Sequence, residues 1–90
     1  MIEVKQAVAN AVGFLREIYD EEGLRDVRLE EVELSEDEGM WQITLSFHRA
    51  GGESTSSDLA AAIFTKREFK TVAVSSATGK VQSMKIRTFS

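Results

Sequence analysis

The chain has 90 residues, 42% of them hydrophobic, which is enough for one domain with a modest core. It has no cysteine, which excludes disulfides and the thiolate cages of structural zinc. Its net charge of −4, together with only one Trp and one Tyr, argues against nucleic acid as a general partner. No stretch approaches the roughly 20 apolar residues of a membrane span, and the first residues lack a signal-peptide pattern. We therefore expect a cytoplasmic protein, with a mature secreted chain as the alternative.

The charge is unevenly divided along the chain. Residues 1–45 hold 12 acids and 4 bases, whereas residues 46–90 hold 3 acids and 7 bases. This division predicts an electrically polar molecule. The bases from Lys66 to Arg87 either form a local basic face or protect exposed strand edges, and the second interpretation is the more common use of lysine in sheets.

The first predicted element is an amphipathic helix over residues 3–22. Apolar residues recur at steps of three and four, the period of a helix with one buried face. The members of this stripe are Val4, Ala7, Val8, Ala11, Phe14, Leu15 and Ile18. Gly23 is expected to adopt a left-handed conformation after the helix. Gly13 interrupts the helix, and a close approach to a sheet is one reason for a glycine there.

Two strands are predicted next. The apolar residues of 26–35 alternate, but the alternation shifts by one residue at Glu30-Glu31, which indicates a β-bulge. After a turn over 35–39, residues 41–47 alternate without a fault, and Trp41 is expected at the rim of the core. The short connection favours antiparallel pairing of the two strands.

Residues 49–67 are predicted to be a flexible insertion, because their first part is rich in turn formers and has no hydrophobic period. Within the insertion, Leu59–Phe64 either forms a helical turn, which we favour, or lengthens the next strand.

A β-hairpin closes the chain, with strands over 68–75 and 80–88 around the turn Thr78-Gly79. Its predicted inward residues are Val72, Val74, Met84 and Ile86. The predicted fold is α+β, in which the helix packs on one face of a four-stranded antiparallel sheet in the order helix, strand, strand, strand, strand.

The hairpin, with Val74, Thr78, Gly79 and Val81, and the preceding helix resemble the PepSY domain, a small module of protease propeptides and bacterial envelope proteins. Small cystatin-like folds share the same layout. In the PepSY pattern an aspartate follows the first valine, and here Ser75 takes its place, so we expect its hydroxyl to bind the turn amides. The resemblance covers about half the chain and implies one PepSY-like domain over 1–90, bacterial, that binds or restrains a protein partner such as a peptidase.

No pattern of catalytic or metal-binding residues is found. His48 is the only histidine, and an exposed strand end explains it better than a catalytic triad. The acids of residues 30–38 lack the spacing of a calcium loop, and Gly51-Gly52 with the following serines lacks the Walker ending. We therefore predict no catalytic, cofactor or metal site.

The expected function is that of a non-enzymatic binding or regulatory module for a protein partner. The predicted partner surface consists of Phe69, Lys70, Lys85, Arg87 and Phe89, which we expect beside the sheet face that the helix leaves uncovered. The alternative is a structural homo-oligomer that pairs through this face or through an open sheet edge. An enzyme would need a pocket between the insertion and the sheet.

Overall fold

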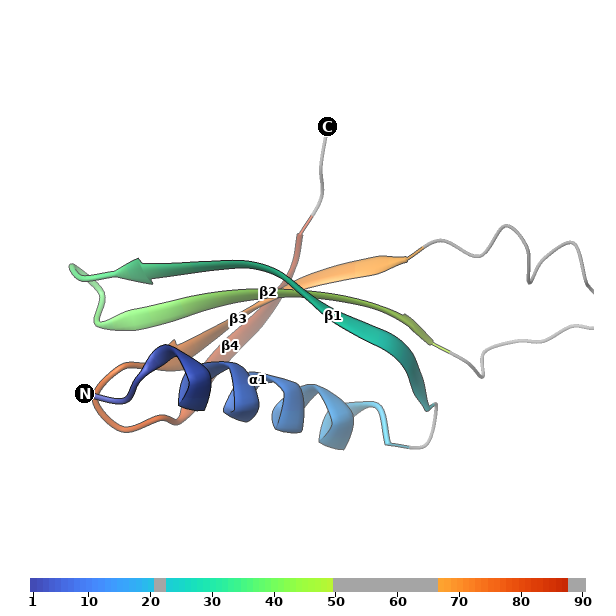
Figure 1. Cartoon of the computed structure of the whole chain (residues 1–90), viewed down its shortest axis with the longest axis horizontal. Coiled ribbons are helices and arrows are strands. Elements are labelled where there is room, and N and C mark those ends of the chain that lie inside the picture. The colour runs from blue at the N-terminus through green and yellow to red at the C-terminus, as the bar shows by residue number, and fades with distance from the viewer. Residues whose placement is uncertain (21–22, 50–66, 88–90) are drawn as a thin grey trace, which may run out of the picture.

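The computed structural model describes residues 1–20, 23–49 and 67–87, which form one helix and four strands in the order α1, β1, β2, β3, β4. The strands make one antiparallel sheet in which chain neighbours are also sheet neighbours. α1 lies along one face of this sheet (Figure 1). The predicted α+β fold is thus confirmed. The predicted insertion at 49–67, including the helical turn at 59–64, lies almost wholly outside the described residues.

The helix α1 spans Val4–Ile18 and buries a narrow face against the sheet. Ala7, Ala11 and Leu15 are fully buried, whereas Val4 and Ile18 at its two ends are 38% and 52% exposed. The small alanines let the helix backbone approach the sheet closely. Gly13 does not serve this purpose, because it is exposed and no atom lies within 4 Å of where its Cβ would stand.

The helix ends four residues earlier than predicted. Tyr19 follows its last turn, and Asp20 places a negative charge near the helix C-terminus, where the dipole disfavours it. Gly23 does have the expected left-handed conformation, with φ of +72°, and its N–H donates to the Tyr19 carbonyl at 3.0 Å. The glycine therefore closes the turn beyond the helix and leads directly into β1.

β1 spans Leu24–Ser35 and β2 spans Met40–Arg49. Their register shifts between Leu29 and Glu31, which confirms the predicted bulge, and shifts a second time between Arg25 and Arg28. Asp26 lies in this second irregularity with φ of +56°. The two shifts bend β1 while keeping Leu29, Val32 and Leu34 opposite the apolar residues of β2.

β3 spans Glu68–Ser75 and β4 spans Val81–Ile86, so the predicted hairpin is confirmed. Gly79 in its turn has φ of +82°. The Ser75 hydroxyl accepts hydrogen bonds from the amides of Ala77 and Thr78, both at 3.2 Å, as expected for the residue at this position.

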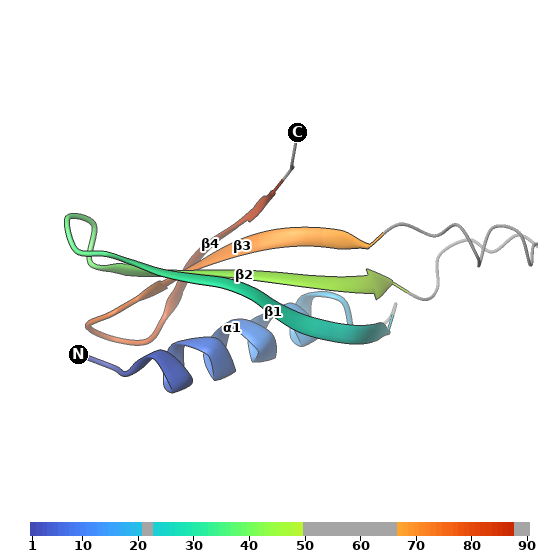
Figure 2. The same ribbon diagram turned by 45° about the horizontal axis from the view of Figure 1, so that its top comes forward.

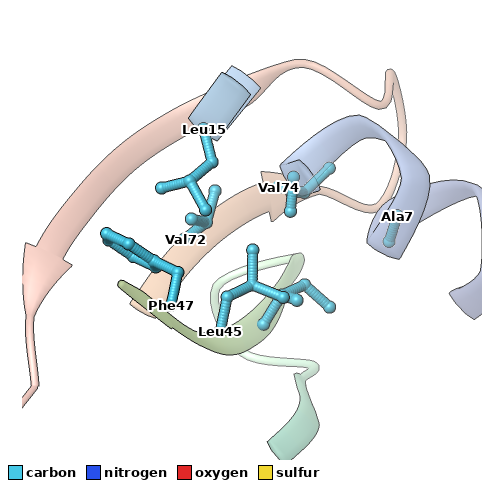
Figure 3. Packing of buried hydrophobic residues seen from close by; sticks show 8 residues of the cluster. Ala7, Leu15, Leu45, Phe47, Val72 and Val74 are labelled. Carbon is cyan, nitrogen blue, oxygen red and sulfur yellow. The ribbon is translucent and has the colours of Figure 1, made fainter. Parts of the chain in front are cut away.

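The core lies between α1 and the central strands. Leu15 points toward Phe47 and Val72, and Leu45 and Val74 continue the same layer (Figure 3). Met84 packs against this layer as predicted, but Ile86 is 73% exposed. Ile86 lies on the α1 side of the sheet, as predicted, but the prediction that it is buried was wrong. β4 diverges from α1 toward its end (Figure 2), so the helix does not cover this part of the strand.

Hydrogen bonds fix the start of the chain to the sheet. The Ile2 N–H donates to the Ser76 carbonyl at 2.7 Å, and the Trp41 indole donates to the Ile2 carbonyl at 3.2 Å. In the second turn of α1, the Asn10 side chain donates to the Gly79 carbonyl at 2.8 Å. Trp41 is thus half-buried at the core's rim, as predicted, and orients the first turn of α1.

Candidate functional site

The strand register assigns the predicted surface residues to the two faces of the sheet. Neighbouring residues in a strand point to opposite faces. Phe69 and Lys85 lie on the face that α1 does not contact, which we call the open face; it also carries Gln42, Thr44, Ser46, Thr71 and Ala73. Lys70 pairs with Ile86 on the α1 side of the sheet. Phe89 lies outside the described residues.

The predicted residues nevertheless gather at one place. The Arg87 N–H donates to the Phe69 carbonyl at 3.0 Å, and Lys70 is the register partner of Ile86. We call this region, made of Phe69, Lys70, Lys85, Ile86 and Arg87, the β3–β4 corner. We expected all of them beside the open face, but they occupy both sides of one sheet edge. Lys70 shares the α1 side with Val72 and Val74, as strand alternation requires.

The centre of the open face is polar yet buried. Thr44 and Ser46 are at most 2% exposed, and Ala73 is 7% exposed. The hydroxyls of Thr44 and Thr71 are 3.0 Å apart and hydrogen-bonded, and the Ser46 hydroxyl donates to a Glu30 carboxylate oxygen at 2.6 Å. These internal bonds satisfy the polar groups that would otherwise oppose burial.

A hollow of about 340 Å³ lies beside this centre, over β2, β3 and β4. Its lining residues are Glu38, Met40, Gln42, Thr71, Ala73, Gln82, Ser83 and Lys85. The Gln42 amide donates to Glu38 at 3.4 Å within it. The lining therefore combines amide, hydroxyl and apolar groups with one anion, Glu38, and one cation, Lys85, which lies at the side of the β3–β4 corner.

The possible catalytic side chains of the open face are far apart. Ser83 lies in register with Ala73 and Gln42, whereas His48 lies six residues further along β2. At about 3.4 Å per residue this is roughly 20 Å. The hollow thus does not bring this serine and the histidine together. Residues 1–20, 23–49 and 67–87 contain no group of three or more side chains that could hold a metal ion, including the acids near the first hairpin.

Arg67 links three strands across the open face, at the end nearest the start of β3. Its side chain is 15% exposed, and its guanidinium forms an ion pair with Asp26 and donates to the Asp26 carbonyl at 2.9 Å and to the Ser46 hydroxyl at 2.8 Å. Removal from water by itself raises the pKa of Asp26, but the hydrogen bonds and charges of Arg28 and Arg67 outweigh this and hold the pKa below its usual range.

A second ion pair crosses the open face from one edge of the sheet to the other. Arg87, following β4, lies 3.1 Å from Glu31 in β1. The pair indicates that the two edges lean toward each other over the open face, since three strand spacings amount to about 14 Å. Arg67–Asp26 and Arg87–Glu31 each join the basic half of the chain to the acidic half, which reduces the predicted electrical polarity.

Sequence reasoning missed the Asp26–Ser46–Arg67 network and the exposure of Ile86. Ser46 occupies a polar position of an alternating strand, where a solvent-facing side chain is the usual expectation. No local signal shows that Glu30 and Arg67 meet it there, because these residues are 16 and 21 positions away in the chain.

The described residues include no helix with the length and hydrophobicity that crossing a bilayer requires. Comparison with protein-family models, curated proteins and solved structures finds no match to this chain.

Proposed function

We propose that this protein is a small non-enzymatic binding module that engages a protein partner at the β3–β4 corner. The observation that carries the proposal is the 73% exposure of Ile86 beside Phe69 and the cations Lys70 and Lys85. Ile86 is a large apolar residue left exposed at a sheet edge, with Lys70 on its own side of the sheet and Phe69 and Lys85 on the other. Exposed apolar area bordered by polar groups is typical of a contact surface.

The open face of the sheet offers a partner less than the β3–β4 corner does. The buried hydroxyls of the open face already bind one another, and Glu30 and Arg67 bind Ser46. A partner gains little from groups whose hydrogen bonds are satisfied. Ile86 offers apolar area that a partner would remove from water, at roughly 25 cal/mol per Å². A peptidase is the partner class that the resemblance to PepSY domains suggests.

Affinity capture from cell extract tests the proposal. The wild-type chain is immobilised beside an Ile86→Ser variant and a matched control, Leu29→Ser, which removes a 49% exposed leucine from the opposite sheet edge. We expect the same protein to be recovered with the wild type and the control but not with Ile86→Ser. Repeated recovery of nothing above background would count against a binding function altogether.

A further inference from the structure

β4 forms a free edge of the sheet. It pairs with β3 on one side, and no described strand pairs with it on the other. In an antiparallel pair, alternate residues direct their backbone groups to the neighbouring strand. Because the Arg87 N–H binds β3, the N–H and C=O groups of Ile86 and Met84 point away from β3, toward the free side. These groups are available to a further strand.

Two different surfaces flank this edge. On the α1 side, Met84 is half-buried and Ile86 is exposed. Asn10 binds the Gly79 carbonyl and so marks the flank of α1 that faces the hairpin; Phe14, one turn later, lies on the same flank. On the open face, Lys85 is exposed at the side of the hollow. A strand added to β4 would therefore meet apolar groups on one side and a cation on the other.

The positive charge around β4 indicates which kind of strand can pair with this edge. Residues 80–87 contain Lys80, Lys85 and Arg87 and no acid. A second copy of β4 would bring these basic residues opposite or diagonal to one another, which is unfavourable. Pairing of β4 with the more acidic β1 of another copy would be head-to-tail and would continue into a ring or an open filament instead of ending at a dimer. An acidic segment of another protein meets neither obstacle.

We propose that the free edge of β4 binds an extended segment of a partner protein as a fifth strand, with apolar residues toward the α1 side and acidic residues toward Lys85. This is β-strand addition, in which backbone hydrogen bonds provide affinity and alternate side chains provide selectivity. The inference rests on the proposed binding function and defines its mode: Lys85 of β4, with Lys80 and Arg87 on either side of the strand, opposes pairing between copies and attracts an acidic strand.

The probe is a synthetic peptide of alternating valine and glutamate, with a valine–lysine peptide of equal length for comparison. Titrating the valine–glutamate peptide into the isotopically labelled protein should change the amide NMR shifts of Met84, Ile86 and their neighbours. Lys85→Glu replaces attraction by repulsion and should weaken binding by about 2- to 30-fold, the range expected from twice a cross-strand charge pair. Lys5→Glu, on an exposed position of α1, makes the same change in net charge and should leave the affinity unchanged.

Ile86→Pro, measured beside Ile86→Ser, tests the backbone part of the proposal, because both variants lose the isoleucine side chain and only the proline also loses the N–H. It removes an N–H that points away from β3, so the hairpin keeps its ladder while the edge loses a donor. We expect loss of peptide binding with unchanged hydrogen-exchange protection in β2 and β3. If the proline disturbs this protection, Lys85→Glu decides the question.

Three results would overturn the proposal: peptide-induced shifts at β1 instead of β4, equal binding of the valine–lysine peptide, or protection of the Ile86 amide that rises with protein concentration in the absence of peptide. The last result would identify a second copy as the occupant. If Lys85→Glu recovers the partner as well as the wild type does while Ile86→Ser loses it, the binding function stands and the β4 mode is wrong. If wild type recovers no partner, the binding function itself fails.

Discussion

Arg67 stabilises an irregular stretch of backbone with one side chain. Its guanidinium binds the carbonyl and carboxylate of Asp26, whose φ of +56° is uncommon for a residue other than glycine, and it also binds the buried Ser46 hydroxyl. Removing the arginine would leave the Ser46 hydroxyl and the irregular backbone at Asp26 with fewer hydrogen-bond partners. The cluster therefore holds the beginning of β1 on β2 and fixes where β3 starts.

The lowered pKa of Asp26 predicts a pH dependence of stability. The folded protein favours the charged carboxylate, so the unfolded chain binds the proton more readily. The resulting stabilisation is complete above about pH 4, the usual aspartate pKa, and is lost as the pH falls through the lowered pKa. Urea unfolding of wild type and Asp26→Asn between neutral and acidic pH measures this contribution. We expect a smaller loss of stability in the variant over the acidic part of the range, and parallel curves would contradict the role of this carboxylate.

At the scale of the elements, α1 is held at its N-terminal end by polar contacts and along its length by the buried side chains of Ala7, Ala11 and Leu15. Ile2, Trp41 and Asn10 fix that end against the β3–β4 turn. Toward the other end of the helix, the sheet twists away and β4 loses its cover (Figure 2). The exposed Ile86 is thus a consequence of how a straight helix crosses a twisted sheet.

Two glycines in and beside this helix have opposite roles, which a pair of alanine substitutions would reveal. Gly13→Ala should stabilise the protein by up to about 1 kcal/mol, because alanine is the better helix former and the new methyl group meets no atom within 4 Å. Gly79→Ala should destabilise it by about 1 kcal/mol or more, because φ is +82° and the methyl group would lie 3.0 Å from the Asn10 amide nitrogen. Urea midpoints at unchanged m-value measure both effects. A destabilised Gly13→Ala protein would show that the helix has a tight contact at this position after all.

At the scale of the whole molecule, acidic β1 and the basic region of β4 form the two edges of one sheet. Ion pairs from Arg87 and Arg67 to β1 partly neutralise this division across the open face. The remaining edge charges oppose pairing of identical edges. Like charges therefore disfavour the pairing of β1 with β1 and of β4 with β4 between copies.

We therefore expect light scattering to give a mass of about 10 kDa at all protein concentrations near neutral pH and moderate salt. If the edge charges are responsible, Lys85→Glu should increase association through β4, because it introduces an acid beside the remaining bases. A wild-type mass that rises with concentration would instead favour the homo-oligomer. A Lys85→Glu protein that stays at the wild-type mass would show that charge does not guard this edge.

The sequence by itself determined the elements and most of the core. Period and alternation are local properties, so they identified α1, the bulge near Glu30, the inward valines of β3 and the turn that Ser75 and Gly79 form. Tertiary structure alone decided what lies beside what: that Arg67 reaches Asp26, that Arg87 reaches Glu31 and that Ile86 lacks cover. The physical reason is that alternation gives the side of a strand, but the twist of the sheet and the length of the helix decide which part of that side is buried.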